Sequence, residues 1–271
     1  MVPVRPEFVP DPGQSRAEME DLQRDVADAA VFEDDIGFDP AAIELDAPVE
    51  VPDPGDGTQT SLAASRADDR SAPLVAGVDQ AFLDERAVSV VVVLRGSTVV
   101  ERAHAVTDLS IPYVPGLLSF REGGPILAAF ERLDSSPDVA LFDGSGRIHF
   151  RQAGLATHMG VVLDLPSVGV AKSLLCGRPR ESVDGRPRGW RTPIEANDRV
   201  DAPAGTVLGY AYQSRQYDSR PIVNPLYVSP GHRVSAATAV DLVARTCAGY
   251  KLPEPTRLAD AYADEVKRTV D

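Results

Sequence analysis

The chain has 271 residues, of which 43% are hydrophobic, enough to bury one core of ordinary size. Its two cysteines, Cys176 and Cys247, are far apart and form no CxxC pair, so the sequence indicates neither a disulfide framework nor a zinc knuckle. The first residues lack a basic segment followed by an apolar one, and no stretch approaches the roughly 20 apolar residues of a membrane span. These properties predict a cytoplasmic protein with no membrane association.

The net charge of -14 argues at first against a nucleic-acid partner, because phosphate binding normally requires a basic surface. The acid is concentrated at the start of the chain, however. Residues 1–73 hold 18 Asp and Glu against 5 Arg, whereas residues 74–271 hold 23 Asp and Glu against 22 Lys and Arg. The body of the chain is therefore nearly neutral. Only three of the 27 basic residues are Lys, a bias typical of salt-loving organisms and equally of GC-rich genomes.

The first predicted element is an N-terminal extension, residues 1–32. Apolar residues recur at helical spacing through 15–32, behind Ser15 and Glu18, which form the pattern of a capping box. Residues 33–73 are acidic and rich in Pro, Gly, Ser and Asp, and this composition is too polar to pack a core. We predict an amphipathic helix followed by a solvated linker or insertion, with an interaction tail as the less favoured interpretation.

Residues 74–271 predict one mixed α/β domain. Three short β-branched runs at 74–79, 87–94 and 98–106 indicate an antiparallel meander. Helical and strand patterns then alternate as in βαβ units. They lie at 117–133 (helix), 139–144 (strand), 154–164 (helix) and 167–173 (strand), followed by a strand at 206–212 and a helix near 235–248. This order is that of a ribonuclease H-like mixed sheet flanked by helices.

Three carboxylates stand where predicted elements begin or end. Asp79 closes LVAGVD and Asp143 follows VALF, so each emerges from an otherwise buried strand, a costly place for a charge. Taken singly, such a residue is more often a turn cap than a ligand. Glu122 opens an apolar helix that can bring it to the other two. A cluster of this kind repels itself unless a cation neutralises it, and its oxygen ligands favour Mg²⁺ or Mn²⁺.

Several longer stretches carry a family resemblance: GVDQAF (77–82), IPYVPGLLSFREGGP (111–125), LFDGSGRIHFRQAGLATHMGVVLDLPSVGVAKS (141–173) and NPLYVSPGHRVS (224–235). They resemble the motifs of endonuclease V, and with LPEPTRLAD the resemblance spans roughly residues 75–260. It implies a ribonuclease H-like fold and Mg²⁺-dependent hydrolysis, with Mn²⁺ as a substitute. It further implies cleavage of the second phosphodiester bond 3′ to a hypoxanthine base, which leaves a 3′-hydroxyl and a 5′-phosphate.

The resemblance also assigns roles to catalytic residues. Asp79, Glu122 and Asp143 match the family's metal-binding carboxylates, and His232 in SPGH matches a further residue near the metals. Two ions about 3.5–4 Å apart would activate water and stabilise the leaving 3′ oxygen. Two further positions match active-site residues: His149, which would contact phosphate or position water, and Lys172, whose charge would face the scissile phosphate. A strand-end Lys usually faces solvent, which is the alternative for Lys172. For His158, on an apolar helix, we expect a packing role.

A base-reading site is implied by the same motifs. PYVPG presents Tyr113 on a stiff loop with Pro112 and Gly116, and in the family this loop is a wedge that holds open the stack left by a rotated nucleotide. An ordinary packed turn aromatic is the alternative. The implied pocket accepts hypoxanthine and excludes guanine by shape, and its residues are Gly116, Leu118, Gly144, Gly146, Leu155 and Ala171. Residues 178–191 hold five Arg, two acids and the only Trp, which indicates either contact with a nucleic-acid backbone or a solvated loop.

The expected enzyme is thus a deoxyribonuclease V, a repair endonuclease acting on single- or double-stranded DNA that contains deoxyinosine, with no protein partner. The resemblance leaves an inosine-specific endoribonuclease as the alternative, because contacts to a 2′-hydroxyl cannot be recognised in the sequence. Two other classes are less favoured. The intact acidic set argues against a silent lesion-binding protein, and the PYVPG loop argues against a general RNA–DNA hybrid nuclease.

Overall fold

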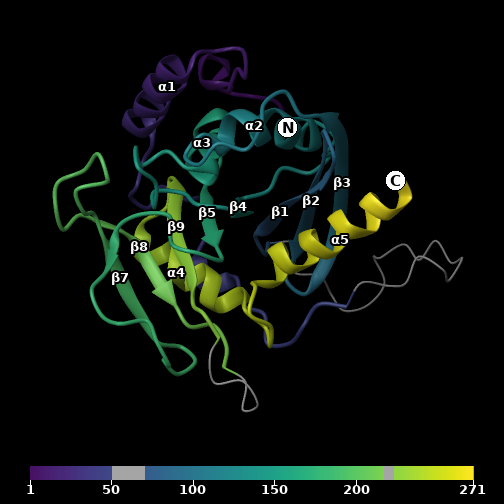
Figure 1. Cartoon of the computed structure of the whole chain (residues 1–271). Helices are drawn as coiled ribbons and strands as arrows, with labels where there is room; N and C mark the ends of the chain where they lie inside the picture. The colour runs from purple at the N-terminus through teal and green to yellow at the C-terminus, as the bar shows by residue number, and fades with distance from the viewer. Residues whose placement is uncertain (51–70, 217–222, 271) are drawn as a thin grey trace, which may run out of the picture.

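The structure is a computed structural model that describes residues 1–50, 71–216 and 223–270. The core of the molecule is one mixed β-sheet. Nine strands within these ranges are ordered β3-β2-β1-β4-β5-β9-β8-β7-β6 (Figure 1). β1 pairs in parallel with β4, and β4 with β5, while the other neighbours are antiparallel. The strands are β1 (Leu74–Leu83), β2 (Arg86–Arg95), β3 (Thr98–Asp108), β4 (Val139–Asp143), β5 (Ser167–Ala171), β6 (Arg178–Pro179), β7 (Arg191–Glu195), β8 (Val207–Tyr212) and β9 (Leu226–His232).

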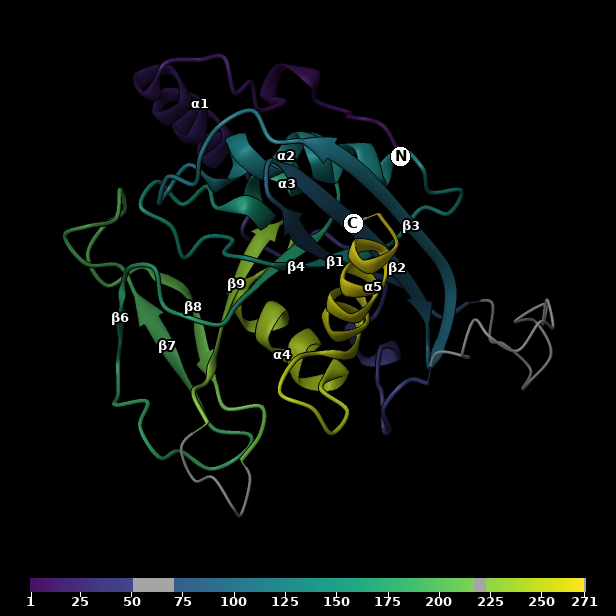
Figure 2. The same ribbon diagram turned by 45° about the vertical axis from the view of Figure 1, so that its right-hand side comes forward.

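Helices cover both faces of this sheet (Figure 2). α2 (Leu118–Phe130) and α3 (Leu155–Leu163) pack on one face, and α4 (Ala236–Thr246) and α5 (Glu254–Val270) on the other. The alternation of strand side chains explains the three layers: Val91 and Val93 of β2 join the core under α2, whereas Val92 joins the core under α5. α1 (Arg16–Ala29) lies outside these layers, against α3.

The sequence predictions for the main elements are confirmed. Ser15 caps α1, and its side chain and that of Glu18 form the expected reciprocal capping box. The meander and the alternating helices and strands from α2 to β5 lie where their patterns predicted them, as do β8 and α4. The sequence analysis did not identify β6, β7 or β9 as strands, nor α5 as a helix. The resulting order, an antiparallel meander followed by βαβ units, is the one expected of a ribonuclease H-like sheet.

The interpretation of residues 33–73 as too polar to pack a core is wrong for their described first part. Ile43 and Val49 are only 6% and 4% exposed, and they join the cores under α4 and α5. The Asp34 carboxylate accepts hydrogen bonds from the backbone N–H and hydroxyl of Ser235 and from Thr238, at the start of α4. Two buried apolar side chains and the hydrogen bonds of Asp34 at the start of α4 therefore hold this acidic segment against the domain. Residues 51–70 lie outside the described residues, and the proposed domain boundaries stay a prediction.

Candidate active site

The register of three neighbouring strands brings the first site residues together. Val78 pairs with Phe142 and Asp143 pairs with Val170, so Asp79, Asp143 and Lys172 follow one another across the same edge of the sheet. β4 and β5 end at this edge and run parallel to β1, which continues beyond Asp79 to Leu83 in its pairing with β2. Glu122 reaches it from α2, and a cavity of about 180 Å³ is lined by Asp79, Glu122 and Asp143 together. The structure thus confirms that these three carboxylates share one site.

Two of these carboxylates are buried at a cost. Burial, reinforced by the charge of Asp143, raises the pKa of Asp79 to about 8, although the Gln80 N–H donates a 2.8 Å hydrogen bond to its carboxylate. Burial also raises the pKa of Glu122 to about 7, against the opposing effect of the Arg121 guanidinium 3.4 Å away. Carboxylates with such raised pKa values lack sufficient positive charge around them, and a cation between them would supply it.

Lys172 is paired with Asp143 across the edge, with 2.7 Å between Nζ and Oδ2. Burial alone would lower the pKa of Lys172, but the hydrogen bond and charge of Asp143, with the charges of Asp79 and Asp260, outweigh it and raise the pKa above its usual value. Lys172 is half-exposed, so its ammonium can be reached from solvent. This position fits contact with a phosphate, as expected from the resemblance.

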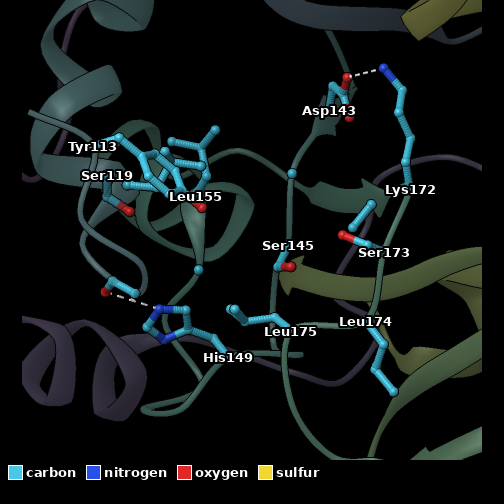
Figure 3. Close-up of a pocket in the computed structure, with 15 residues that line it drawn as sticks. Tyr113, Ser119, Asp143, Ser145, His149, Leu155, Lys172, Ser173, Leu174 and Leu175 are labelled. Atoms are coloured by element: carbon cyan, nitrogen blue, oxygen red, sulfur yellow. Dashed lines mark hydrogen bonds and ion pairs between the residues drawn. The ribbon is translucent and has the colours of Figure 1, made fainter.

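A second pocket adjoins the carboxylates (Figure 3). Its volume is about 370 Å³, within the range of ligand sites, and it shares Asp143 and Leu155 with the smaller cavity. Tyr113, Ser119 and Leu155 lie on one side, and Lys172, Ser173 and Leu174 on the other (Figure 3). Nine residues expected at the site line it: Tyr113, Gly116, Leu118, Asp143, Gly144, His149, Leu155, Ala171 and Lys172.

Two expected pocket residues do not line this pocket. Pro112 is exposed on the loop outside it. Gly146 lies behind the pocket wall, where a Cβ would come within 2.3 Å of the Pro230 carbonyl oxygen, so its glycine is required by close backbone packing against β9. The prediction that Gly146 lines the base pocket is therefore wrong in this arrangement. Pro112, expected as part of the wedge loop, stays a prediction, since it is exposed beside Tyr113.

The PYVPG loop presents its aromatic ring as expected. Tyr113 is 63% exposed, one of the few exposed large hydrophobic side chains in the described chain. Gly116 has a positive φ of 83°, which favours glycine, and a Cβ there would meet the Phe150 ring at 3.1 Å. The loop therefore turns sharply at Gly116, and Tyr113 stands at the mouth of the pocket.

His149 lies in the pocket wall with both ring nitrogens already engaged. Its Nε2 is 3.1 Å from the Gly116 carbonyl oxygen, and its Nδ1 accepts from the Arg151 backbone N–H at 3.3 Å. A carbonyl can only accept, so Nε2 carries the proton and the ring is neutral, in agreement with burial lowering its pKa to about 4. This geometry assigns His149 to holding the loop rather than to contacting phosphate.

His232 is not at the carboxylate site. It pairs with Ser167 at the start of β5, whereas Asp143 pairs with Val170, three residues or about 10 Å along the strand. The His232 ring is buried and bonded to Asp164 on one side and to the Val31 N–H on the other. The predicted metal role of His232 is therefore wrong, because the strand register carries it to the opposite end. His158 is fully buried and bonded to the Phe8 carbonyl, which confirms its packing role.

The arginines of residues 178–191 are largely paired with acids in the structure. Arg180 pairs with Glu195, and Arg191 with Asp241. Arg186 lies over the Trp190 ring, 4.5 Å from its centroid, and also pairs with Glu181. These contacts fit the solvated-loop interpretation and leave contact with nucleic acid as a prediction.

The sequence analysis missed one acidic residue and much of the pocket wall. Asp260 of α5 lies close enough that its charge raises the pKa of both Asp79 and Lys172. The available signal was its place in LPEPTRLAD, to which no role had been given. The other pocket residues, which had no distinguishing signal, are Ser119, Ser145, Gly154, Ser173, Leu174 and Leu175.

The donor set suits a hard divalent cation, although the carboxylates do not enclose one as they stand. Within residues 1–50, 71–216 and 223–270, no three His, Cys, Asp or Glu side chains converge into a closed metal cage. Sparse oxygen ligation of this kind leaves positions for water and phosphate oxygens. Buried carboxylates thus lie beside a pocket large enough for a base and beside the Lys172 ammonium, which is paired with Asp143. The described helices are all too short or too polar to cross a membrane.

Comparison with known proteins identifies the family of this chain. The family model of endonuclease V matches residues 58–261. An endonuclease V from the halophilic archaeon Haloarcula marismortui is 61% identical and covers 99% of this chain and 98% of its own. The crystal structure of endonuclease V from Streptomyces avermitilis superposes with a TM-score of 0.72 at 29% identity, covering 98% of this chain and 97% of its own.

A further solved structure shares the fold at lower identity. The endonuclease V of Ciona intestinalis has a TM-score of 0.68 at 24% identity, covers 94% of this chain and 98% of its own, and was solved with a 24-mer DNA containing an inosine followed by a ribo-adenosine. These likenesses confirm the ribonuclease H-like fold expected from the sequence. The chain belongs to the endonuclease V family and is an endonuclease.

Proposed function

We propose that this endonuclease hydrolyses the second phosphodiester bond 3′ to a deoxyinosine, leaving a 3′-hydroxyl and a 5′-phosphate, in the repair of deaminated DNA. The complex of the Ciona intestinalis protein with inosine-containing DNA supports the substrate class. Both cysteines are free thiols, which fits a reducing compartment, and we expect the activity in the cytoplasm.

One observation carries the proposal: the buried carboxylates and the base-sized pocket are adjacent and share Asp143 and Leu155. A nucleotide whose base entered the larger pocket would therefore have its own backbone beside Asp143 and Lys172. The scissile bond, one nucleotide further on the 3′ side, would then lie next to the carboxylates. This adjacency is what a nuclease requires when it cleaves beside the base that it recognises.

Asp79, Glu122 and Asp143 would hold Mg²⁺, or Mn²⁺ in its place. The raised pKa values of Asp79 and Glu122 and the oxygen donors of all three side chains fit a hard cation, and Asp260 adds negative charge nearby. When bound, the ion supplies Lewis-acid character and positive charge to the phosphate. Lys172 is paired with Asp143, and its ammonium would donate to a non-bridging phosphate oxygen, where negative charge increases during hydrolysis.

The pocket would recognise hypoxanthine mainly by shape. Leu118 and Leu155 contribute apolar walls, and Gly116 and Gly144 bring the backbone close to the space between them. Guanine carries an exocyclic amine that hypoxanthine lacks, so a close wall at that position excludes guanine. Tyr113, exposed at the mouth, would occupy the gap left in the base stack.

A cleavage assay tests the proposal directly. Labelled single- and double-stranded DNA and RNA, each with one hypoxanthine or one guanine at the same position, would be incubated with Mg²⁺, Mn²⁺ or EDTA. We expect cleavage only when the oligonucleotide contains hypoxanthine and a metal ion is present. The cut should fall at the second phosphodiester bond on the 3′ side of the lesion. Faster cleavage of the inosine RNA would favour the endoribonuclease alternative, and equal cleavage of guanine controls would contradict the proposal.

A further inference from the structure

The carbonyl of Gly116, at the turn of the PYVPG loop, accepts two side-chain hydrogen bonds from distant parts of the chain. One comes from the Nε2 of Gln23 in α1, at 2.8 Å and 93 residues away. The other comes from His149, at 3.1 Å and 33 residues away. Gln23 is fully buried, which is unusual for a polar residue of a helix at the molecular surface. Its side chain therefore serves a contact inside the molecule.

These two donors are joined through Arg151 into a closed ring. The Arg151 guanidinium donates to the Gln23 Oε1 at 3.1 Å, and the Arg151 backbone N–H donates to the His149 Nδ1 at 3.3 Å. Glu20, one turn earlier in α1, pairs with the same guanidinium at 2.7 Å. The ring fixes the orientation of the Gln23 amide, because the NH₂ must face a carbonyl and the oxygen must face a guanidinium. Each donor in this ring of hydrogen bonds therefore faces an acceptor, and each acceptor faces a donor.

Apolar contacts hold the same loop from α1. Met19, Leu117 and Phe120 form a small buried cluster, against which Ile111 and Val114 of the loop are packed. The Leu117 N–H donates to the Val114 carbonyl and closes the turn. The loop is thus fixed behind Tyr113, while Tyr113 itself stays exposed at the mouth of the pocket. α1 lies outside the catalytic sheet but supports the loop on which the base-reading residues stand.

We propose that Gln23 is a positioning residue for lesion recognition: its amide holds the Gly116 carbonyl, so that α1 sets the place of the PYVPG loop and of the pocket rim before substrate binds. This inference rests on the proposed function of the loop. Because the loop is already ordered before substrate binds, binding does not carry the entropic cost of ordering it. The hydrogen bond from Gln23 therefore increases affinity for the hypoxanthine site. The chemistry at Asp79, Glu122 and Asp143 does not depend on it.

Gln23→Glu tests the donor alone. The carboxylate has the shape of the amide and still accepts from Arg151, but it cannot donate to the Gly116 carbonyl and presents a second acceptor to it. Gln23→Met removes both hydrogen bonds while keeping an unbranched side chain of similar size. Arg24→Gln is the matched control, since it makes the same change of net charge at a half-exposed neighbour in α1 that does not contact the loop.

The first measurement is hydrogen exchange of the free, full-length protein, followed by peptide. We expect Gln23→Glu and Gln23→Met to speed exchange in the peptide that covers residues 111–117. Exchange in other core peptides and the melting temperature should change little. Arg24→Gln should leave exchange unchanged. The second is kinetics on a hypoxanthine duplex. KM should rise about tenfold in both Gln23 variants while kcat stays within about twofold, because only loop ordering is lost.

The outcomes separate this inference from the proposed function. If the wild-type protein does not prefer hypoxanthine, the proposed function fails, and the exchange data still decide whether Gln23 anchors the loop. If both Gln23 variants show wild-type exchange at 111–117 and wild-type KM, the positioning role is wrong. A uniform rise in exchange along the chain, with a lower kcat and an unchanged KM, would show a general loss of stability and would also overturn the positioning role.

Discussion

At the scale of single residues, the site depends on carboxylates placed where a charge is costly. Replacing Asp79 or Asp143 by Asn, or Glu122 by Gln, keeps the shape of each side chain and removes the charge that would hold a cation. We expect cleavage with Mg²⁺ to fall by a factor of about 100 to 1,000 or more, as for the loss of other preorganised electrostatic groups. For the Asp79 and Glu122 variants, binding of the hypoxanthine oligonucleotide should change by no more than about threefold, because neither side chain lines the pocket proposed for the base.

Asp84→Asn is the matched control for these three variants. Asp84 is an exposed turn residue with a φ of 46°, a conformation that Asn tolerates, and it lies away from the two site cavities. Single-turnover cleavage and equilibrium binding would be measured for all four proteins. Wild-type turnover in any of the three site variants would remove that residue from the metal site.

The raised pKa values predict how the metal-free protein responds to pH. Burial, with the charge of Asp143, raises the pKa of Asp79 to about 8, and burial raises that of Glu122 to about 7. Between roughly pH 4 and these values the folded protein keeps protons that the unfolded chain releases, so their contribution to stability is present below about pH 4 and lost as pH rises. In EDTA, the melting temperature of wild type relative to Asp79→Asn should therefore fall from pH 5 to pH 9.

Mg²⁺ should reverse this loss, since it binds the ionised carboxylates and releases their protons. The rise in melting temperature on adding Mg²⁺ should thus be larger at pH 8.5 than at pH 6 in the wild type. Calorimetric titrations in two buffers of different ionisation enthalpy would count the released protons. If Asp79→Asn and the wild type have parallel pH profiles and release equal numbers of protons, the carboxylate at position 79 is not protonated as described.

Tyr113 should act in recognition and contribute little to stability. Its side chain is 63% exposed, so Tyr113→Ala should leave the melting temperature nearly unchanged. Affinity should fall about tenfold for duplex DNA and much less for single strands, because only the duplex has a stack to hold open. Tyr250→Ala, at another exposed tyrosine away from the pocket, serves as the control. An equal loss on single strands and duplexes would contradict a wedge.

At the scale of elements, strand register decides which predicted residues meet. Parallel pairing of β1, β4 and β5 sets Asp79, Asp143 and Lys172 side by side, although Asp79 lies within β1 and only Asp143 and Lys172 stand at strand ends as expected. His232 has an equally specific motif, but β9 runs antiparallel to β5, so that its last residue lies at the other end of the strand. A motif identifies the residue type, and only the direction of its strand decides the edge.

The acidic segment after α1 gives a second prediction at this scale. Ile43 is buried in the core under α4, so Ile43→Ala should cost about 2–4 kcal/mol of unfolding free energy, as other large-to-small core substitutions do. Val31→Ala, at a side chain that is 39% exposed, should cost less than about 0.5 kcal/mol. Urea unfolding of both variants measures the difference. Equal small effects would restore the interpretation of residues 33–50 as solvated.

At the scale of the whole molecule, charge is distributed unevenly. The net charge of -14 lies almost entirely in residues 1–73, whereas the body that carries the site is nearly neutral. Replacing Asp53, Asp56, Asp68 and Asp69 by Asn removes four charges from a stretch outside the described residues. Affinity for a hypoxanthine oligonucleotide should rise at low salt and change little at high salt, because salt screens the repulsion of phosphate. An unchanged affinity across a salt series would mean that this stretch is remote from the nucleic acid.

The sequence by itself determined the class of fold, the order of the elements from α1 to β5 and the three carboxylates. Periodicity, caps and strand-end charges are local properties of the chain, so Ser15, the meander and Asp79, Glu122 and Asp143 could be recognised without coordinates. Only the tertiary structure decided what depends on distance through space. It separated His232 from the carboxylates, bonded both nitrogens of His149, brought Asp260 to the site and joined Gln23 to Gly116 across 93 residues. Contacts between residues so far apart in the sequence leave no periodic or local pattern in it, because the packing of the whole fold decides which side chains are buried and which groups pair.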